Sequence, residues 1–137
     1  MSEGTCLPGF EGIIIYIGAD KAKDKMILVC FFDMDQRPSR NCMRQLNARA
    51  KELMAKDVVV AAVQTSRVDK NILKEWIIKN NIPFSVGMVQ GDKEKIRFSW
   101  GVRSLPWLIL TDKEHIVTAE GFSVTELDKK LNNDSNR

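Results

Sequence analysis

Cysteine is the side chain of this sequence best suited to nucleophilic chemistry, and the chain holds three, Cys6, Cys30 and Cys42. Their odd number and wide spacing predict neither a disulfide framework nor a zinc site, so we expect no metal and no other cofactor. Cys42 is the candidate catalytic residue because it follows a predicted helix start with arginines nearby, and both features lower the pKa of a thiol. Cys30 lies in an apolar run that predicts burial, and Cys6 has no neighbouring group to activate it.

The residues before Cys42 form a candidate binding segment, called here the helix-start segment. Its members are Gln36, Arg37, Pro38, Ser39 and Arg40. Proline suits the first turn of a helix, and main-chain N–H groups at such a start, with arginines beside them, could hold a carboxylate or another anion. The alternative is that these residues only begin the helix and that Cys42, in line with Leu46, is an inert core residue.

Other groups with acid–base character are isolated in the sequence. Asp33 and Asp35 alternate at the end of an apolar run, but no further ligand accompanies them, so a solvated loop is the simpler interpretation. His115, the single histidine, adjoins a predicted turn, where we expect it to point toward solvent rather than to contact Cys42.

The elements that must position these groups follow from the apolar pattern. Residues 26–32 and 58–63 are continuous apolar runs, as expected of parallel strands covered on both faces. A predicted helix over residues 38–56 separates them, which favours a right-handed parallel crossover. The other expected elements are an arm laid against the core at 1–12, a strand at 13–17, a turn-rich connection at 18–25, a helix at 69–80 with Ile72 and Leu73 inward, a short strand at 84–89, helical turns at 92–100, a hairpin of 107–110 with 115–120, a helix at 125–131 and a frayed tail at 132–137.

Composition indicates a single globular domain over residues 1–137. Hydrophobic residues make up 44% of the chain and charged residues 28%, and this length can bury a core without disulfides or metals. The net charge is only +3, with basic and acidic residues interleaved, so we expect no nucleic-acid partner. No apolar stretch has the length of a membrane span, so no membrane insertion is expected.

The first residues lack the basic start and apolar run of a secretory signal. As written, the chain is expected to be soluble and cytoplasmic, whereas a domain excised from an envelope or periplasmic parent would look the same. The pattern contains no coiled-coil seam, and it leaves the oligomeric state open.

Two segments give the chain a family resemblance. The sequence LVCFFDMDQRPSRNC resembles the strand and helix start of the TlpA-like, or redoxin, branch of the thioredoxin-like superfamily, where a Cys-Pro-Pro-Cys motif follows the strand. In that register Gln36 and Ser39 stand in place of the two cysteines. The segment WGVRSLPWLILTDKEHIV resembles the family's passage through a cis-proline into its hairpin, and Pro106 takes the cis-proline position.

The resemblance covers about residues 7–131 and implies a thioredoxin-like α/β fold, with a central mixed sheet and helices on both faces. Leu105, Pro106 and Trp107 would then lie beside the helix start, where the family exposes main chain that receives an extended peptide. A dithiol reaction needs two sulfurs at that helix start. We therefore expect a domain that has lost disulfide reductase activity and that binds a peptide or protein.

Two alternatives stay open, so whether the chain is an enzyme is undecided. The spacing from Ser39 to Cys42 is similar to that between the threonine or serine and the peroxidatic cysteine of peroxiredoxins. This similarity allows a single-cysteine thiol oxidoreductase or peroxidase-like enzyme that uses Cys42 and an external thiol. The other alternative is an accessory domain of a larger envelope protein, which serves as a spacer or docking surface.

Overall fold

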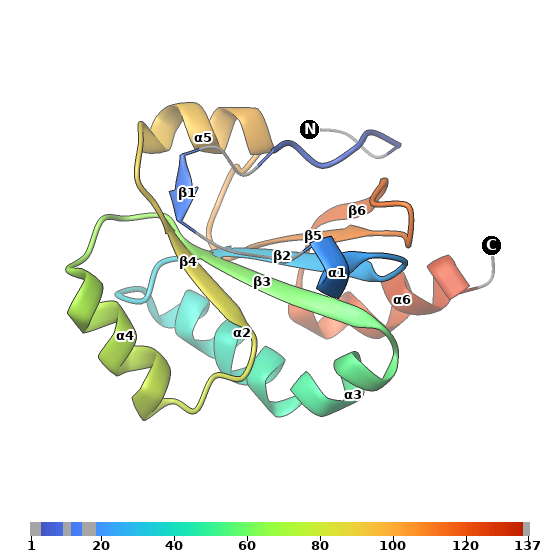
Figure 1. The fold of residues 1–137 in the computed structure, drawn as a ribbon, viewed down its shortest axis with the longest axis horizontal. Coiled ribbons are helices and arrows are strands. Elements are labelled where there is room, and N and C mark those ends of the chain that lie inside the picture. Colours follow the sequence, from blue (N-terminus) through green and yellow to red (C-terminus); the bar gives the residue numbers. More distant parts are fainter. Residues whose placement is uncertain (1–3, 10–11, 15–18, 136–137) are drawn as a thin grey trace.

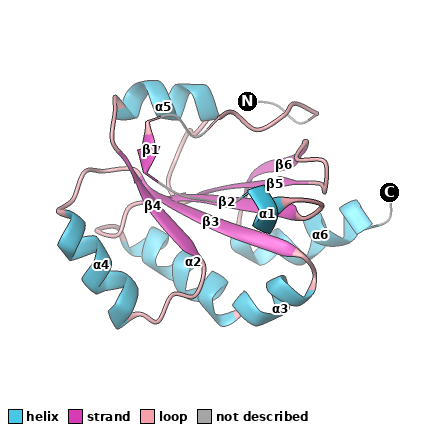
Figure 2. Cartoon of the chain, in the orientation of Figure 1, coloured by secondary structure: helices cyan, strands magenta, loops and turns pink. Residues whose placement is uncertain are grey.

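The computed structural model describes residues 4–9, 12–14 and 19–135, which form one six-stranded sheet with helices on both faces (Figure 1, Figure 2). The strand order across the sheet is β1-β4-β3-β2-β5-β6. The strands are β1 (Ile13–Ile14), β2 (Met26–Phe32), β3 (Val58–Gln64), β4 (Ser85–Val89), β5 (Trp107–Thr111) and β6 (Val117–Phe122). The helices are α1 (Ala19–Ala22), α2 (Arg37–Ala48), α3 (Ala50–Ala55), α4 (Lys70–Lys79), α5 (Lys93–Trp100), the 3-10 turn η1 (Val124–Glu126) and α6 (Leu127–Ser135). The predicted mixed α/β architecture is confirmed.

Strands β2 and β3 form the centre of the sheet and run parallel, as the two apolar runs predicted. All seven residues of β2 are buried, because helices cover the sheet on both sides of it. β4 continues the parallel part beside β3, whereas β5 pairs antiparallel with β2 and β6 pairs antiparallel with β5. The predicted hairpin is therefore present. Residues 33–35 join the central strand β2 to the helix-start segment.

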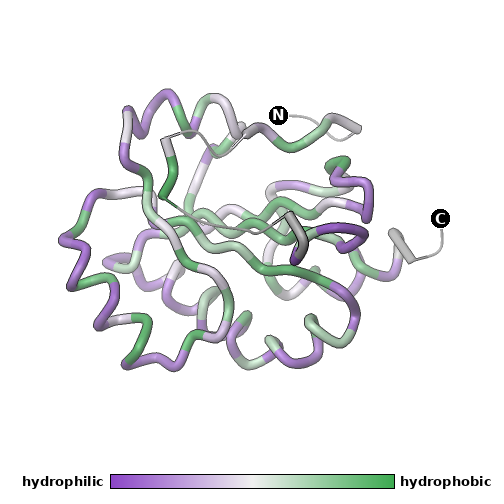
Figure 3. Tube along the Cα trace, in the orientation of Figure 1, coloured by the Kyte–Doolittle hydropathy of each residue, from purple (hydrophilic) through white to green (hydrophobic). Residues whose placement is uncertain are grey.

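Successive side chains of β2 point to two different cores, one on each face of the sheet. Phe32 points to the face covered by α2, α3, α4 and α6, where it stacks on Trp76 with ring centroids 5.5 Å apart. Phe31 points to the face covered by α1 and α5, where it meets Trp100 edge-on at 5.3 Å. Figure 3 shows that the central strands consist mostly of hydrophobic residues, whereas the surrounding helices mix hydrophilic and hydrophobic ones.

Several boundaries differ from the sequence prediction. The predicted helix over residues 38–56 is two helices, because Arg49 leaves the helical region with φ and ψ of −104° and 7°. The connection at 18–25 contains the short helix α1, and α6 runs to Ser135, so residues 132–135 belong to a helix rather than to a frayed tail. Of the strand predicted at 13–17, only residues 13 and 14 lie within the described residues.

Residues 4–9 of the predicted arm lie against the hairpin, since the N–H of Gly4 donates to the carbonyl of Val117 at 2.8 Å. Helix α4 begins as predicted, because the Asp69 side chain accepts a hydrogen bond from the N–H of Asn71. Leu73 of this helix is buried, but Ile72 is 52% exposed, which corrects its expected inward position. The inward stripe of α4 is narrow, and a residue one position before Leu73 is rotated away from it.

Candidate functional site

The chain leaves the carboxyl end of β2 and enters α2 through the helix-start segment. Gln36 is the N-cap residue, with φ and ψ of −104° and 132°, and its side chain makes no capping hydrogen bond. Pro38 lies in the first turn, where its missing N–H removes no helical hydrogen bond. The first turn of α2 holds no acidic side chain, so the positive end of its dipole is not offset within the helix.

Ser39 connects this helix start to the strand before it. The residue is fully buried, and its Oγ accepts a hydrogen bond from the main-chain N–H of Asp33 at 3.1 Å. Ser39 stands where the resemblance places a cysteine, and its hydroxyl links α2 to the end of β2. The other members of the segment, Gln36, Arg37, Pro38 and Arg40, are exposed. The Nη1 of Arg40 donates to the carbonyl of Met34 at 3.2 Å.

Asp33 is buried rather than part of a solvated loop, which corrects the sequence interpretation. Its side chain is held by the Oγ of Ser66 at 2.9 Å, the main-chain N–H of Asp35 at 3.0 Å and the Nε2 of Gln64 at 3.4 Å. Burial raises the pKa of Asp33, but the hydrogen bonds from Asp35, Ser66 and Gln64 outweigh it, and the pKa is lower than that of an ordinary aspartate. The carboxylate is therefore kept ionised.

Sequence reasoning did not single out Gln64 and Ser66, the partners of Asp33. The available signal was the position of Gln64, a polar residue that directly ends the apolar run of β3. Because β2 and β3 are parallel, their carboxyl ends meet at one edge of the sheet, and the two polar ends lie side by side there. Gln64 also accepts a hydrogen bond from the N–H of Met34 at 2.8 Å, so it fixes the turn into α2.

A groove of about 310 Å³ lies beside the first turns of α2. It is lined by Pro38, Asn41, Cys42 and Gln45 of α2, by Ser104, Leu105, Pro106 and Leu108, and by Gly121, Phe122, Ser123 and Val124. The Leu105–Pro106 peptide bond is cis. The fold thus brings three predicted binding residues, Pro38, Leu105 and Pro106, together with Cys42.

Asn41 and Gln45 were not singled out from the sequence, although they lie three and seven residues after Pro38, a spacing that puts all three on one face of the helix.

Trp107, predicted as a binding residue, packs instead with the core on the α1 and α5 face. Its ring covers Gly121, where a Cβ would lie 2.7 Å from the nearest ring atom. Ser39 and Trp107 therefore support the groove without lining it.

Cys42 meets the thiol of Cys30 beneath the groove. The two Sγ atoms are 3.9 Å apart, and both residues are free thiols without a disulfide between them. Cys30 is fully buried, and Cys42 is 3% exposed. The contact with Cys30 lowers the pKa of Cys42 although burial raises it, whereas the contact with Cys42 and burial both raise the pKa of Cys30. Cys6 is exposed in the arm.

His115 is half-buried and does not point freely toward solvent, which corrects the prediction. Its Nε2 lies 2.8 Å from the carbonyl oxygen of Ala22, to which it can donate, so the ring contacts α1 rather than Cys42.

Across the described residues, no three His, Cys, Asp or Glu side chains gather in a way that could hold a metal ion. Among the helices of that same part of the chain, none has the length and apolarity needed to cross a membrane.

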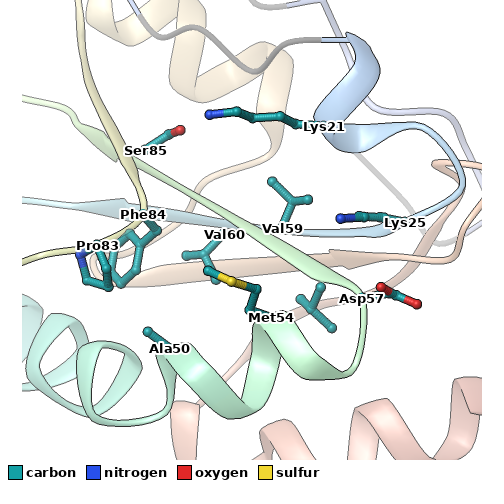
Figure 4. A pocket seen from close by; sticks show the side chains of 11 residues that line it. Lys21, Lys25, Ala50, Met54, Asp57, Val59, Val60, Pro83, Phe84 and Ser85 are labelled. Atoms are coloured by element: carbon teal, nitrogen blue, oxygen red, sulfur yellow. The ribbon is translucent and has the colours of Figure 1, made fainter.

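A second cavity, of about 290 Å³, lies at the amino end of β3, away from the polar groups that follow β2 and β3 (Figure 4). Its walls include Met54, Val60 and Phe84, and the side chains of Lys21 and Lys25 lie over it (Figure 4). It shares no lining residue with the groove. The chemistry implied by the sequence therefore belongs to the groove and the helix start.

No protein-family model matches the chain, and no curated protein matches it by sequence. The thioredoxin domain of a thiol-disulfide oxidoreductase from Bacteroides vulgatus superposes with a TM-score of 0.78 at 18% identity, over 97% of each chain. A thiol:disulfide interchange protein from Bacteroides sp. gives a TM-score of 0.77 at 19% identity, covering 100% of this chain and 92% of the other.

A thioredoxin family protein from Chlorobium tepidum, also named as a thiol:disulfide interchange protein, gives a TM-score of 0.69 at 16% identity over 98% of each chain. These superpositions span nearly the whole chain, so the predicted thioredoxin-like fold is confirmed. The identities are low, and what is shared is the fold. The function has to be argued from the residues at the site.

Proposed function

We propose that this protein binds an extended peptide, or an extended segment of a partner protein, in the groove beside α2, and that its helix start does not reduce disulfides. The groove itself carries the proposal, because it joins the first turns of α2 to the loop that contains Pro106. The sequence resemblance assigns an extended peptide to the same two segments. The proposal therefore rests on a cavity and a resemblance that coincide.

The lining of the groove suits a peptide better than a small polar ligand. Its apolar part includes Leu105, Pro106 and Val124, which can receive a hydrophobic side chain. Asn41 and Gln45 are exposed on the α2 side, where their amides can bond to the main chain of a bound strand. An extended peptide presents such alternating apolar side chains and polar main-chain groups.

The absence of reductase activity follows from the chemistry of Gln36 and Ser39. Disulfide exchange proceeds through attack by a thiolate and a mixed disulfide, and neither an amide nor a hydroxyl can form one. Ser39 is also fully buried and bonded to the main chain of Asp33. In a dithiothreitol-coupled insulin assay we expect no turnover above the uncatalysed rate, and turnover like that of an ordinary thioredoxin would contradict this part of the proposal.

The binding part can be tested with a displayed library of random dodecapeptides selected on the folded protein. Selected peptides would be labelled and their dissociation constants measured by fluorescence polarisation. The informative variant is Asn41→Trp, which places an indole in the groove from an exposed helical position. The matched control is Asn71→Trp, the same change at an exposed position of α4.

We expect Asn41→Trp to weaken binding of the selected peptides at least about tenfold, which corresponds to about 1.4 kcal/mol. Asn71→Trp should leave the dissociation constants unchanged. Chemical-shift changes in the ¹⁵N-labelled protein should centre on the groove residues. A selection that yields no binder, or binders that are insensitive to Asn41→Trp, would overturn the assignment of the groove.

A second candidate function, a single-cysteine thiol enzyme that uses Cys42 and an external thiol, is favoured by the surroundings of Cys42. Cys42 lines the groove, and its contact with Cys30 lowers its pKa. Alkylation of the folded protein by iodoacetamide over a range of pH tests this candidate. Fast alkylation of Cys42 with a midpoint below that of an ordinary thiol would support it, and alkylation only after unfolding would exclude it.

A further inference from the structure

The contact between Cys30 and Cys42 joins two segments that the sequence keeps apart. Cys30 is the fifth residue of β2, and Cys42 lies in α2 one turn beyond Ser39. Side chains at alternate positions of β2 point toward the α2 face, and Cys30 belongs to this set with Leu28 and Phe32. The crossover therefore lays one thiol on the other, with Sγ atoms 3.9 Å apart.

The two thiols differ in their access to solvent. Cys30 is fully covered by the strand, the helix and Cys42 itself, whereas Cys42 lines the groove and keeps 3% of its surface exposed. A small oxidant in the groove thus meets Cys42 first, and Cys30 lies behind it. In this arrangement the sulfur of Cys42 reacts with the oxidant, and the sulfur of Cys30 lies close enough to react with Cys42 afterwards.

The acidities of the two thiols support the same order. The contact with Cys30 lowers the pKa of Cys42, although burial raises it. The pKa of Cys30 is raised by its hydrogen bond with Cys42 and by burial. Cys42 is therefore the more acidic thiol of the pair.

We propose that Cys30 and Cys42 form a dithiol that hydrogen peroxide, or another hydroperoxide small enough for the groove, oxidises to an intramolecular disulfide. The site is distinct from the helix start, where Gln36 and Ser39 carry no sulfur. Cys42 lines the groove proposed for the peptide, but the oxidation needs no bound peptide. In the second candidate function an external thiol reduces Cys42, whereas here Cys30 supplies the second sulfur. To form the bond, the Sγ atoms must approach from 3.9 Å to about 2 Å.

The reaction has two steps. The Cys42 thiolate attacks one oxygen of hydrogen peroxide, the O–O bond breaks, and the second oxygen leaves as hydroxide and takes up a proton to form water, while Cys42 becomes a sulfenic acid. The Cys30 sulfur, after losing its proton, attacks the Cys42 sulfur. The S–S bond then forms as the S–O bond breaks, and the departing hydroxide takes up one proton to leave as water. The dithiol loses two electrons and two protons, and one peroxide is reduced to two waters.

The test uses the folded full chain with Cys6→Ser, which removes the exposed thiol and its intermolecular disulfides. The protein is treated with a small excess of hydrogen peroxide, then denatured and alkylated with N-ethylmaleimide, and its intact mass is measured. We expect a loss of about two mass units and no adduct, and a peptide map with Cys30 linked to Cys42. If the oxidised protein is first reduced with dithiothreitol, the disulfide should open and both cysteines should then carry an N-ethylmaleimide adduct.

Two variants separate the roles of the sulfurs. Cys30→Ala in the same background should stop at a sulfenic acid on Cys42, which dimedone traps, whereas Cys42→Ala should leave Cys30 unreacted. The mass change is measured on the Cys6→Ser protein, which keeps both buried cysteines. The test therefore remains decisive even if Cys30→Ala or Cys42→Ala fails to fold. The proposal is overturned by two alkylated thiols after treatment, by oxidation that stops on Cys42 with Cys30 still a thiol, or by a disulfide that forms only in denaturant.

Discussion

The hydroxyl of Ser39 accepts a hydrogen bond from the main-chain N–H of Asp33 at 3.1 Å, and this contact ties the first turn of α2 to the end of β2. Both residues are buried. At the position that the resemblance gives to a cysteine, a hydroxyl oxygen thus holds the helix start against the strand end. Four sets of variants test this junction and the packing around the groove.

The first concerns Ser39 itself. Ser39→Ala leaves the buried N–H of Asp33 without its acceptor, so the free energy of unfolding should fall by about 1–3 kcal/mol. Chemical denaturation monitored by tryptophan fluorescence measures this loss. Ser99→Ala, at an exposed position of α5, is the control and should change stability by no more than about 0.5 kcal/mol. Equal stabilities of the two variants would contradict the structural role of the hydroxyl.

The second concerns the ionised state of Asp33. Because its folded-state pKa is lowered, the carboxylate contributes stability above the unfolded-state pKa, and this contribution is lost as the pH falls through the folded-state value. Asp33→Asn should therefore cost about 1–3 kcal/mol at neutral pH, and the difference from the wild type should shrink in acid. Urea unfolding at several pH values measures it, with the exposed Asp35→Asn as control. A difference that grows in acid would refute the assignment.

The third introduces sulfurs at the two positions that the sequence resemblance gives to cysteines. The double variant Gln36→Cys with Ser39→Cys places two thiols at the start of α2, where the helix dipole favours the thiolate. We expect it to gain disulfide reductase activity in the insulin assay, while Gln36→Cys alone and the wild type stay at the uncatalysed rate. A double variant that forms its disulfide and yet reduces no insulin would show that more than two sulfurs is missing.

The fourth concerns the ring of Trp107 over Gly121. Gly121 has a φ of +71°, and an added Cβ would lie 2.7 Å from the ring, so Gly121→Ala should cost about 1–3 kcal/mol from overpacking beyond its backbone strain. Gly4→Ala is the matched control, since Gly4 has a φ of +85° and open space around it.

The same pair can be checked with a double-mutant cycle in thermal unfolding. Trp107→Phe removes the ring atoms that the new Cβ would meet, so the double variant should lose less stability than the sum of the two single variants. Additive losses would show that the indole and Gly121 are not in contact.

The amino-acid sequence by itself determined the elements that depend on local pattern. The continuous apolar runs predicted β2 and β3, the Asp69 cap predicted the start of α4, and the Pro106 segment carried the resemblance to a fold that the structural comparisons confirm. It also determined what the site lacks, because the residues at the helix start are an amide and a hydroxyl whatever the tertiary arrangement.

Only the tertiary structure decided which of these residues meet. Periodicity placed Cys30 on a strand and Cys42 on a helix, but a contact of 3.9 Å depends on the register and tilt with which the helix packs on the sheet. The same reason explains the burial of Asp33, whose partners Gln64 and Ser66 come from the next strand and the loop after it. Local patterns fix the face of an element, whereas ångström-scale contacts between distant segments are set by how the whole core packs.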